Sequence, residues 1–359
     1  MRGILISGYY GFGNSGDDAL LMSIISDFKN KGLQDRITVL SANPAETKRV
    51  YGVNSINRIN PFSLIYHLIT CRLFISGGGT LIQDGTSTKS LVYYLTLIRL
   101  ALFFGKKVML YANGIGPVTK PANRKSCTAV LNRVNCITVR DEKSLEELKA
   151  LKISSPEIKL TADPVFLLPA DVASDKLQIP DGEYFCISVR NTKNLADGFA
   201  DSVAEALDVI CEKYSVNAVM LPLQAVDREI SAKISSKMKN PAHIINERLT
   251  PHEIMNVVSH SCMCIGMRLH MLIYAAAVAT PLVGIVYDPK VSGFMEYAKQ
   301  KLFVEADRLT AENLAALTDR CMNERDIIKE ELIREREKFR NLAGENTALA
   351  IKLYEERKH

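Results

Sequence analysis

The sequence predicts an α/β protein with two doubly wound parallel sheets, one in each of two domains. Short apolar runs alternate with stretches of helical period along the whole chain, which is the pattern of parallel α/β architecture. The runs form two series, and the stretch between them carries Pro169, Pro180 and the turn signal Asp181-Gly182. The length of 359 residues also fits two domains, because single cores rarely grow past roughly 250–300 residues. We therefore expect Rossmann-like domains over residues 1–170 and 171–359, the second with terminal helices.

The first series contains five strand-like runs. They cover residues 3–7, 37–40, 72–76, 107–111 and 136–139. Each run is short, continuous and apolar, as expected for strands that are buried on both faces of a parallel sheet. Helical periodicity lies between most of them, for example over residues 18–30 and 144–151.

The second series shows the same alternation. Its strand-like runs cover residues 184–189, 218–222, 243–245, 263–266 and 282–286, with helices expected over 200–213 and 250–259. From about residue 310 on, Glu, Arg and Lys recur at helical spacing, which predicts long surface helices. Ligands of open parallel sheets bind at the carboxyl ends of the strands. The loops that follow the strand-like runs are therefore the places to look for a site.

Composition and charge narrow the function classes. Hydrophobic residues make up 47% of the chain and charged residues 24%, which is typical of a globular protein with a large core. The net charge is +5, with both signs interspersed. This mild excess suits an anionic substrate or an anionic membrane surface, and it is too weak and dispersed to favour nucleic acid.

The eight cysteines are scattered, and Met1-Arg2 leads straight into a strand-like run instead of a secretory signal. We therefore expect reduced thiols and a cytoplasmic protein. Cys262 and Cys264 have the spacing of a metal-ligand pair, and His270 lies nearby. Their alternation fits one buried strand better, so no metal site is expected.

One apolar run, residues 91–104, is too short for a transmembrane helix and contains Arg99. It predicts a core helix. Because the basic pair Lys106-Lys107 follows it, a second interpretation stays open, in which this run rests peripherally on the inner face of a membrane.

The loop after the first strand is rich in glycine and opens the first helix. Glycines let a ligand approach the backbone, and a helix N-terminus offers free N–H groups. Gly11, Gly13 and Gly16 match the dinucleotide pattern G-x-G-x-x-G. However, Asp17 and Asp18 would repel a pyrophosphate, and no ribose-binding acid follows the second strand. Two interpretations stay open: a turn in which Asp17 or Asp18 caps the helix, or a ligand loop in which Asp17 orients a hydroxyl or a catalytic partner.

Three consecutive glycines, Gly77 to Gly79, follow the third strand. Such a run is costly unless something approaches the backbone. A nest for a sugar or an anion is one explanation, and a close crossing of strand and helix is the other. The loop over residues 111–117 repeats the pattern more weakly.

Two arginines stand directly after strands, Arg140 in the first series and Arg190 at the equivalent place in the second. A guanidinium at such a position can fork onto a carboxylate or a phosphate. The structural alternative for Arg140 is an ion pair with Asp141.

The last two loops carry Arg268, His270 and Lys290. Arg268 and His270 lie where a strand gives way to an apolar helix, and histidine titrates in the range that acid–base catalysis uses. Lys290 follows the next strand, where it offers a point charge to an anionic ligand. A buried, satisfied histidine and a solvated lysine are the structural alternatives.

Taken together, these loops resemble the polysaccharide pyruvyl transferase family, and most closely its CsaB-type, cell-wall anchoring members. The matching segments are GYYGFGNSGDDA, SGGGTLIQD, ANGIGPV, VRDEKS, ADPVF, GMRLHMLIYAA and YDPKVSGF. They run in this order from residue 8 to residue 294, so the resemblance covers most of the chain. It implies a fold similar to GT-B glycosyltransferases, with two Rossmann-like domains facing across a cleft and terminal helices that often pack back on the first domain.

The resemblance also implies an activity that a fold alone does not. The family moves the pyruvyl group of phosphoenolpyruvate onto two hydroxyls of one sugar, which forms a cyclic ketal and releases phosphate. In CsaB-type members the acceptor is a lipid-linked disaccharide that ends in N-acetylmannosamine, and the product belongs to a secondary cell-wall polymer that anchors S-layer proteins.

This chemistry assigns expected roles to the residues that match the motifs. His270 is the expected general acid for the methylene carbon, and Asp17 is a candidate base for the sugar hydroxyl. Arg140, Arg268 and Lys290 are expected to bind phosphoenolpyruvate. The candidates for acceptor contacts are Asn14, Gly16, Gly78, Gly79 and Arg190. The scheme requires no metal and no organic cofactor.

One departure from the family pattern concerns Arg190, which is followed by Asn191 where an aromatic residue or a proline is expected. Three alternatives of other classes stay open. They are a nucleotide-sugar glycosyltransferase of the same fold, a non-catalytic sugar-binding protein, and a dinucleotide-dependent oxidoreductase.

Overall fold

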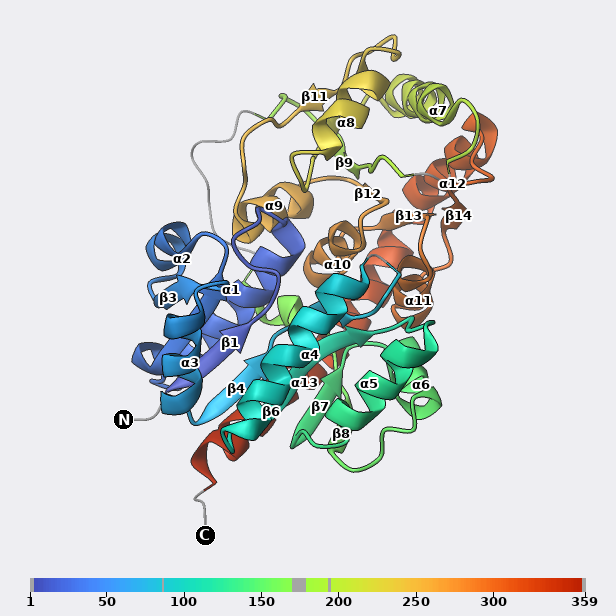
Figure 1. The fold of residues 1–359 in the computed structure, drawn as a ribbon. Coiled ribbons are helices and arrows are strands. Elements are labelled where there is room, and N and C mark those ends of the chain that lie inside the picture. The colour runs from blue at the N-terminus through green and yellow to red at the C-terminus, as the bar shows by residue number, and fades with distance from the viewer. Residues whose placement is uncertain (1–2, 86, 170–178, 193–194, 357–359) are drawn as a thin grey trace. The chain divides into compact units, whose positions relative to one another are not determined.

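The computed structural model describes residues 3–85, 87–169, 179–192 and 195–356. The chain forms two compact units, shown in Figure 1. The first unit is Met1–Leu167 together with Phe339–His359, and the second is Leu168–Lys338.

The first unit is built on a parallel sheet with the strand order β3-β2-β1-β4-β6-β7-β8, in which β5 pairs with β6. Its strands are β1 (Ile4–Ser7), β2 (Ile37–Ser41), β3 (Asn54–Asn57), β4 (Leu73–Ser76), β5 (Gly79–Ile82), β6 (Lys107–Ile115), β7 (Cys136–Val139) and β8 (Glu157–Leu160). The five apolar runs of the first series correspond to β1, β2, β4, β6 and β7. The strand order reverses direction between β1 and β4, which is where open α/β sheets bind their ligands.

Helices cover both faces of this sheet (Figure 1). They are α1 (Ser15–Asn30), α2 (Pro44–Tyr51), α3 (Pro61–Thr70), α4 (Thr88–Phe103), α5 (Pro121–Leu131) and α6 (Glu142–Ala150), with short 3-10 turns at Gln34–Arg36 and Pro164–Leu167. One hydrophobic core lies under α3 to α6 and includes Leu68, Ile98 and Leu148. The other lies under α1 and includes Phe28 and, from the end of the chain, Leu353.

The end of the chain belongs to the first unit. Helix α13 (Arg325–Glu355) begins in the second unit and ends in the first. Arg72 Nη2 donates to the carbonyl oxygen of Glu355 at 2.9 Å, and Asn346 Nδ2 donates to that of Ala162 at 3.1 Å. The predicted domain bounds put these terminal residues in the second domain, whereas the family resemblance implied that terminal helices pack back on the first, as Phe339–His359 do. Contacts between residues this far apart in the chain leave no trace in local periodicity.

The second unit repeats the architecture on a parallel sheet with the order β11-β10-β9-β12-β13-β14. Its strands are β9 (Tyr184–Ser188), β10 (Asn217–Met220), β11 (His243–Ile244), β12 (Cys264–Gly266), β13 (Leu282–Val286) and β14 (Phe303–Glu305). Its helices are α7 (Phe199–Tyr214), α8 (Asp227–Ser235), α9 (Pro251–Ser259), α10 (Leu269–Val278), α11 (Pro289–Tyr297) and α12 (Ala311–Asn323). Here the order reverses between β9 and β12.

The apolar run over residues 91–104 lies in α4, where Leu91, Leu95 and Ile98 are buried in the core. The expected core helix is therefore confirmed. Among the helices that the structure describes, none combines the length and the apolar character that crossing a bilayer requires.

Candidate active site

In the first unit, the glycine-rich loop after β1 leads into α1. Asn14 caps this helix, and its Oδ1 accepts a hydrogen bond from the backbone N–H of Gly16 at 3.1 Å. Asp17 and Asp18 follow in the first turn, both nearly buried, where a negative charge meets the positive end of the helix dipole. The capping residue is thus Asn14, whereas the structural alternative of the sequence analysis gave that role to Asp17 or Asp18.

The glycines after β4 allow the strand to approach α1 closely. A Cβ atom on Gly78 would lie 2.9 Å from Leu20 Cδ2, and one on Gly79 would lie 2.9 Å from Asp17 Oδ1. Gly79 also has a φ of +95°, a region that side chains avoid. The close crossing of strand and helix therefore explains Gly78, while at Gly79 the buried backbone passes next to the carboxylate of Asp17.

Arg140 follows β7 and has only 6% of its surface exposed. Its Nη1 donates to Asp163 Oδ2 at 2.7 Å, and its Nη2 lies 3.4 Å from Thr80 Oγ1. Asp141 is a weaker partner, with its Oδ2 3.9 Å from Arg140 Nε, and it also caps α6. The ion pair that we considered as the structural alternative is therefore present, but its main partner is Asp163.

These contacts gather Asp17, Gly79, Thr80 and Arg140 at the carboxyl edge of the first sheet.

An aromatic pair lies in the glycine-rich loop after β1: the rings of Tyr9 and Phe12 stack with their centroids 4.2 Å apart. Both rings are about half exposed. This pair was not predicted from the sequence. Two aromatic residues inside a glycine-rich loop were a usable signal, because ligand sites are commonly lined by aromatic side chains.

In the second unit, Tyr287 holds two of the predicted cations. Arg190 Nη1 donates to the Tyr287 hydroxyl at 2.8 Å, and the Arg190 guanidinium lies 5.1 Å from the centre of that ring. Lys290 Nζ lies 5.9 Å from the same ring centre and 3.5 Å from Asp288 Oδ2. The carboxyl ends of β9 and β13 therefore place Arg190 and Lys290 on one tyrosine.

Arg268 stands at the N-terminus of α10 and is locked by a carboxylate. Its Nε donates to Asp227 Oδ2 at 2.9 Å, and its Nη2 donates to the other oxygen of the same side chain. Asp227 is fully buried and Arg268 is 9% exposed. Such a two-bonded pair fixes the plane of the guanidinium. Sequence analysis missed Asp227, because an acid at the start of a helix looks like an ordinary helix-end residue.

His270 is the second residue of α10 and is partly buried. Its ring centre lies 6.3 Å from that of Tyr274, one turn further along the helix. Because Arg268 precedes it by two residues, the Asp227 pair also positions the first turn that carries His270. The second unit thus brings a histidine and three cations to the carboxyl edge of its sheet. A meeting of this group with the group of the first unit, across a cleft, stays a prediction.

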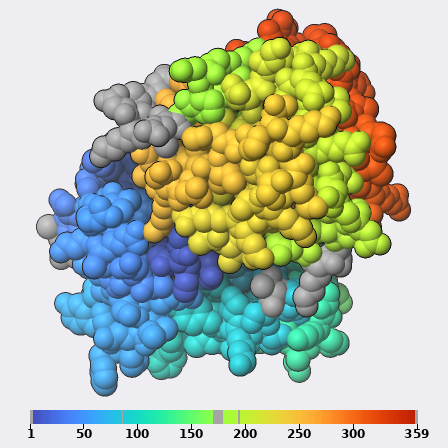
Figure 2. All heavy atoms as spheres, turned by 90° about the horizontal axis from the view of Figure 1, so that it is seen from above, coloured from blue at the N-terminus to red at the C-terminus, as the bar shows by residue number. Residues whose placement is uncertain are grey.

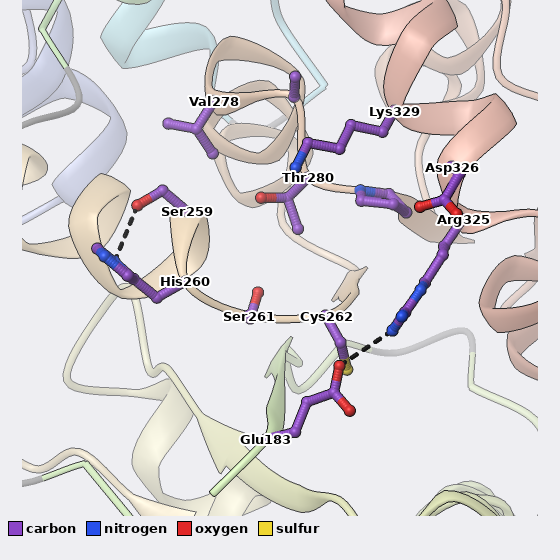
Figure 3. Close-up of a pocket in the computed structure, with 12 residues that line it drawn as sticks. Glu183, Ser259, His260, Ser261, Cys262, Val278, Thr280, Arg325, Asp326 and Lys329 are labelled. Carbon is purple, nitrogen blue, oxygen red and sulfur yellow. Dashed lines mark hydrogen bonds and ion pairs between the residues drawn. The ribbon is translucent and has the colours of Figure 1, made fainter.

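A pocket of about 350 Å³ in the second unit is not part of this arrangement (Figure 3). Its lining includes Glu183, Cys262 and Thr280, which precede β9, β12 and β13. The pocket therefore lies at the amino edge of the sheet. Figure 3 shows the ion pair between Arg325 and Glu183, 3.0 Å long, at its rim. Burial raises the pKa of the Cys262 thiol to about 12, which disfavours the nucleophilic thiolate.

Comparison with known proteins identifies a family. The model of a family described as polysaccharide pyruvyl transferase matches residues 14–289. The amylovoran biosynthesis protein AmsJ of Erwinia amylovora is 22% identical over 276 residues, which cover 70% of this chain and 66% of that protein. The alignment thus spans just under two thirds of the length of this relative.

Solved structures share the fold over the whole chain. A putative UDP-N-acetylglucosamine 2-epimerase from Listeria monocytogenes matches with a TM-score of 0.69 at 11% identity, covering 100% of this chain and 98% of that chain. A glycosyltransferase from Rickettsia africae matches with a TM-score of 0.66 at 13% identity, covering 99% of this chain and 100% of that chain. At these identities the likeness concerns the fold alone. The predicted α/β fold of two Rossmann-like, GT-B-like domains is confirmed.

Proposed function

The chain belongs to the polysaccharide pyruvyl transferase family, and from this premise we propose that it transfers the pyruvyl group of phosphoenolpyruvate to a sugar and forms a cyclic ketal. Family membership makes it a transferase that acts in polysaccharide modification. The observation that supports the finer proposal is that His270, Arg268, Arg190 and Lys290 all follow strands at the carboxyl edge of one sheet.

The reaction begins with a proton transfer to carbon. His270 donates a proton to the methylene carbon of phosphoenolpyruvate, so that its C2 becomes electrophilic, and a sugar hydroxyl adds to C2. A base accepts the proton of that hydroxyl, and the proton passes on to His270, which is thereby reprotonated. A second hydroxyl of the same sugar then displaces phosphate from C2, and its proton leaves with the phosphate. The product is a ketal with two new C–O bonds, and no electrons are gained or lost.

Cations are needed because phosphoenolpyruvate carries a phosphate and a carboxylate. We assign Arg190, which the sequence predicted as an acceptor contact, and Lys290 to the anion together with Arg268, because both lie against the ring of Tyr287. The charge of Arg268 is balanced by Asp227, so Arg268 contributes directed N–H groups more than net charge. Such preorganised donors stabilise the departing phosphate.

The first unit supplies the acceptor side of the proposal. Asp17 is the proposed base, and its nearly buried carboxylate lies beside the backbone of Gly79. Asn14 and Gly16 form the first turn next to it. Arg140, paired with Asp163, is proposed to reach the donor through the side of its guanidinium that contacts Thr80.

The acceptor is proposed to be a lipid-linked disaccharide that ends in N-acetylmannosamine, used for a secondary cell-wall polymer that anchors S-layer proteins. The pyruvyl transfer is proposed to take place in the cytoplasm, at the inner face of the membrane. The name of the relative AmsJ refers to amylovoran biosynthesis, so an exopolysaccharide acceptor is the competing choice within the same activity.

The decisive experiment incubates the full chain with phosphoenolpyruvate and a defined lipid-linked disaccharide. We expect phosphate release that depends on the acceptor, and a pyruvyl ketal on the sugar by mass spectrometry. Phosphoenolpyruvate turnover on an exopolysaccharide fragment alone would keep the activity and replace the acceptor.

A second candidate is a nucleotide-sugar glycosyltransferase of the same fold, and one structure that shares the fold is named a glycosyltransferase. Turnover of a UDP-sugar without any dependence on phosphoenolpyruvate would establish this candidate and reject pyruvyl transfer.

A further inference from the structure

Helix α3 presents an apolar stripe to solvent. Phe62, Ile65, Tyr66 and Ile69 are 85%, 42%, 63% and 51% exposed, and Ile59, just before the helix, is 77% exposed. The spacing of three and four residues places the four helical positions on one side of α3. Among the residues of this helix, only Leu68 is buried. The helix thus turns most of its apolar side chains away from the core.

A contiguous stripe of this kind differs from the single apolar residues that scatter over ordinary protein surfaces. Larger exposed apolar patches mark sites of interaction with proteins or membranes. In the space-filling view, the blue segment that contains α3 lies at the molecular surface (Figure 2).

The stripe continues onto the end of α4. Phe103, the last residue of α4, is 80% exposed. Lys106 Nζ donates to the carbonyl oxygen of Ile69 at 2.5 Å, which joins the end of α4 to the end of α3. We define the α3 surface as Ile59, Phe62, Ile65, Tyr66, Ile69 and Phe103. The rest of the apolar run over residues 91–104 faces mainly into the core, so α3 supplies most of the exposed apolar area.

The same part of the chain is strongly cationic. Residues 47–140 contain 13 lysines and arginines and a single acidic residue, Asp84. The other 265 residues carry 32 basic and 39 acidic side chains. The modest net charge of +5 therefore hides a segment at +12 and a remainder at −7. This segment holds α3, α4 and α5, which cover one face of the first sheet.

Several of these cations contact neutral groups. Arg99 Nη2 donates to Ser126 Oγ at 2.7 Å, and Lys120 Nζ donates to Thr88 Oγ1 at 2.8 Å. Such partners leave these two charges uncompensated, so they act on whatever approaches this face. Three other cations of the segment, Lys107, Arg124 and Arg140, are paired with Glu356, Glu147 and Asp163.

We propose that the α3 surface docks the first unit onto a lipid bilayer with anionic headgroups. The apolar stripe enters the boundary between headgroups and acyl chains, and the surrounding cations face the negative surface. Tyr66 fits this place because its ring has an apolar body and a polar tip. A second copy of the chain is a poorer occupant, since two strongly positive faces would repel each other.

Membrane docking deepens the proposed function, and its biological purpose rests on the lipid-linked acceptor proposed there. Docking would keep the enzyme where such an acceptor is found. The binding itself requires no turnover, and this allows the two proposals to fail separately.

The test is co-sedimentation of the full chain with vesicles. We expect binding to vesicles of phosphatidylcholine with phosphatidylglycerol, weaker binding to phosphatidylcholine alone, and a loss of binding as salt is added. The triple variant Phe62→Gln, Ile65→Gln, Ile69→Gln should weaken partitioning onto the anionic vesicles by about tenfold or more.

The matched control replaces equally exposed apolar residues of the second unit: Val209→Gln, Val226→Gln, Ile327→Gln. It should bind vesicles like the unchanged protein. Circular dichroism melts confirm that both triple variants fold, and all three proteins should turn over phosphoenolpyruvate equally with a soluble acceptor analogue. If the unchanged protein turns over that analogue but binds no anionic vesicles, the docking proposal is overturned and the proposed function is not. Equal binding by the α3 variant would also overturn it, as would an α3 variant that turns a stable dimer into a monomer.

Discussion

Two buried carboxylates determine what the arginines of the candidate site can do. Asp163 holds Arg140 at 2.7 Å, and Asp227 holds Arg268 through both of its oxygens. A buried guanidinium without such a partner would be strongly disfavoured, because its desolvation is not repaid. The carboxylates therefore fix the arginines in place and balance their charge. Arg190 differs from them, because it donates to the neutral hydroxyl of Tyr287, while Lys290 near the same ring has the partly exposed Asp288 as its partner.

The Asp227–Arg268 pair leads to a stability prediction. Asp227→Asn leaves a buried guanidinium without its counter-charge, so the free energy of unfolding should fall by about 3–5 kcal/mol. Urea denaturation followed by circular dichroism measures this. The double variant Asp227→Asn, Arg268→Gln should be more stable than the single one. The control Asp201→Asn, which breaks the exposed pair with Lys237, should change little. A loss from Asp227→Asn no larger than that of this control would contradict the assignment.

His270 carries the catalytic prediction. His270→Ala should lower kcat for phosphate release by about 10²–10⁴-fold, as expected for loss of a general acid. The thermal midpoint should stay near that of the unchanged protein, because the side chain is only partly buried. His252→Ala, in the first turn of α9 and likewise partly buried, is the matched control and should keep full turnover. Unchanged turnover in His270→Ala would reject the general-acid role.

At the scale of elements, Asp84 ties the loop after β5 to the start of α5. Burial alone would raise the pKa of Asp84, but the backbone N–H groups of Thr119 and Lys120 and the Asn123 amide donate to it and hold its pKa well below the usual range. The carboxylate is the capping group that α5 otherwise lacks, since Lys120 provides no side-chain cap.

This arrangement predicts a pH-dependent stability. Because the native pKa of Asp84 is depressed, its contribution is present above the unfolded pKa of about 3.9 and is lost as the pH falls through the native pKa. Asp84→Asn should cost about 1–3 kcal/mol near neutral pH, and the difference from the unchanged protein should shrink below about pH 4. Urea unfolding at several pH values measures it. Asp35→Asn, at an exposed position, serves as the control and should have little effect. A constant difference for Asp84→Asn across this range would refute the depressed pKa.

Sequence patterns identified the central strands and missed strands at the margins. The runs that become β1, β4 and β9 are continuous and apolar because both faces of a central parallel strand are buried. The outer strands β3, β8 and β14 are partly exposed and contain polar residues. They lack the signal that periodicity relies on. Strand β5 follows β4 after only two residues and falls inside the glycine loop.

At the scale of the whole molecule, the GT-B-like fold serves several chemistries, so a ligand test must separate them. Phosphoenolpyruvate should stabilise the native chain, because a ligand that binds only the folded state adds free energy of about 2.7 kcal/mol at a hundredfold excess over Kd. The thermal midpoint should then rise by about 5–10 °C. UDP, the nucleotide in one structure of this fold, should leave it unchanged. Differential scanning fluorimetry decides between them, and a shift with UDP alone would favour the glycosyltransferase candidate.

The sequence by itself determined the α/β class, the two parallel sheets and the positions of the glycine-rich loops, because local periodicity and the glycines that follow strands reveal them. It also placed Arg190, Arg268, His270 and Lys290 at strand ends, all of which lie at the carboxyl edge of one sheet in the structure.

Only the tertiary structure decided which partners these residues have. Asp227 lies 41 residues before Arg268 in the chain, and Asp163 lies 23 residues after Arg140. The last helix turn contacts Arg72 from the far end of the sequence. The apolar stripe of α3 also needed the structure, since the sequence alone cannot say which side of an apolar helix faces the core. Pairing and burial depend on contacts between distant segments, and periodicity reports only on neighbours.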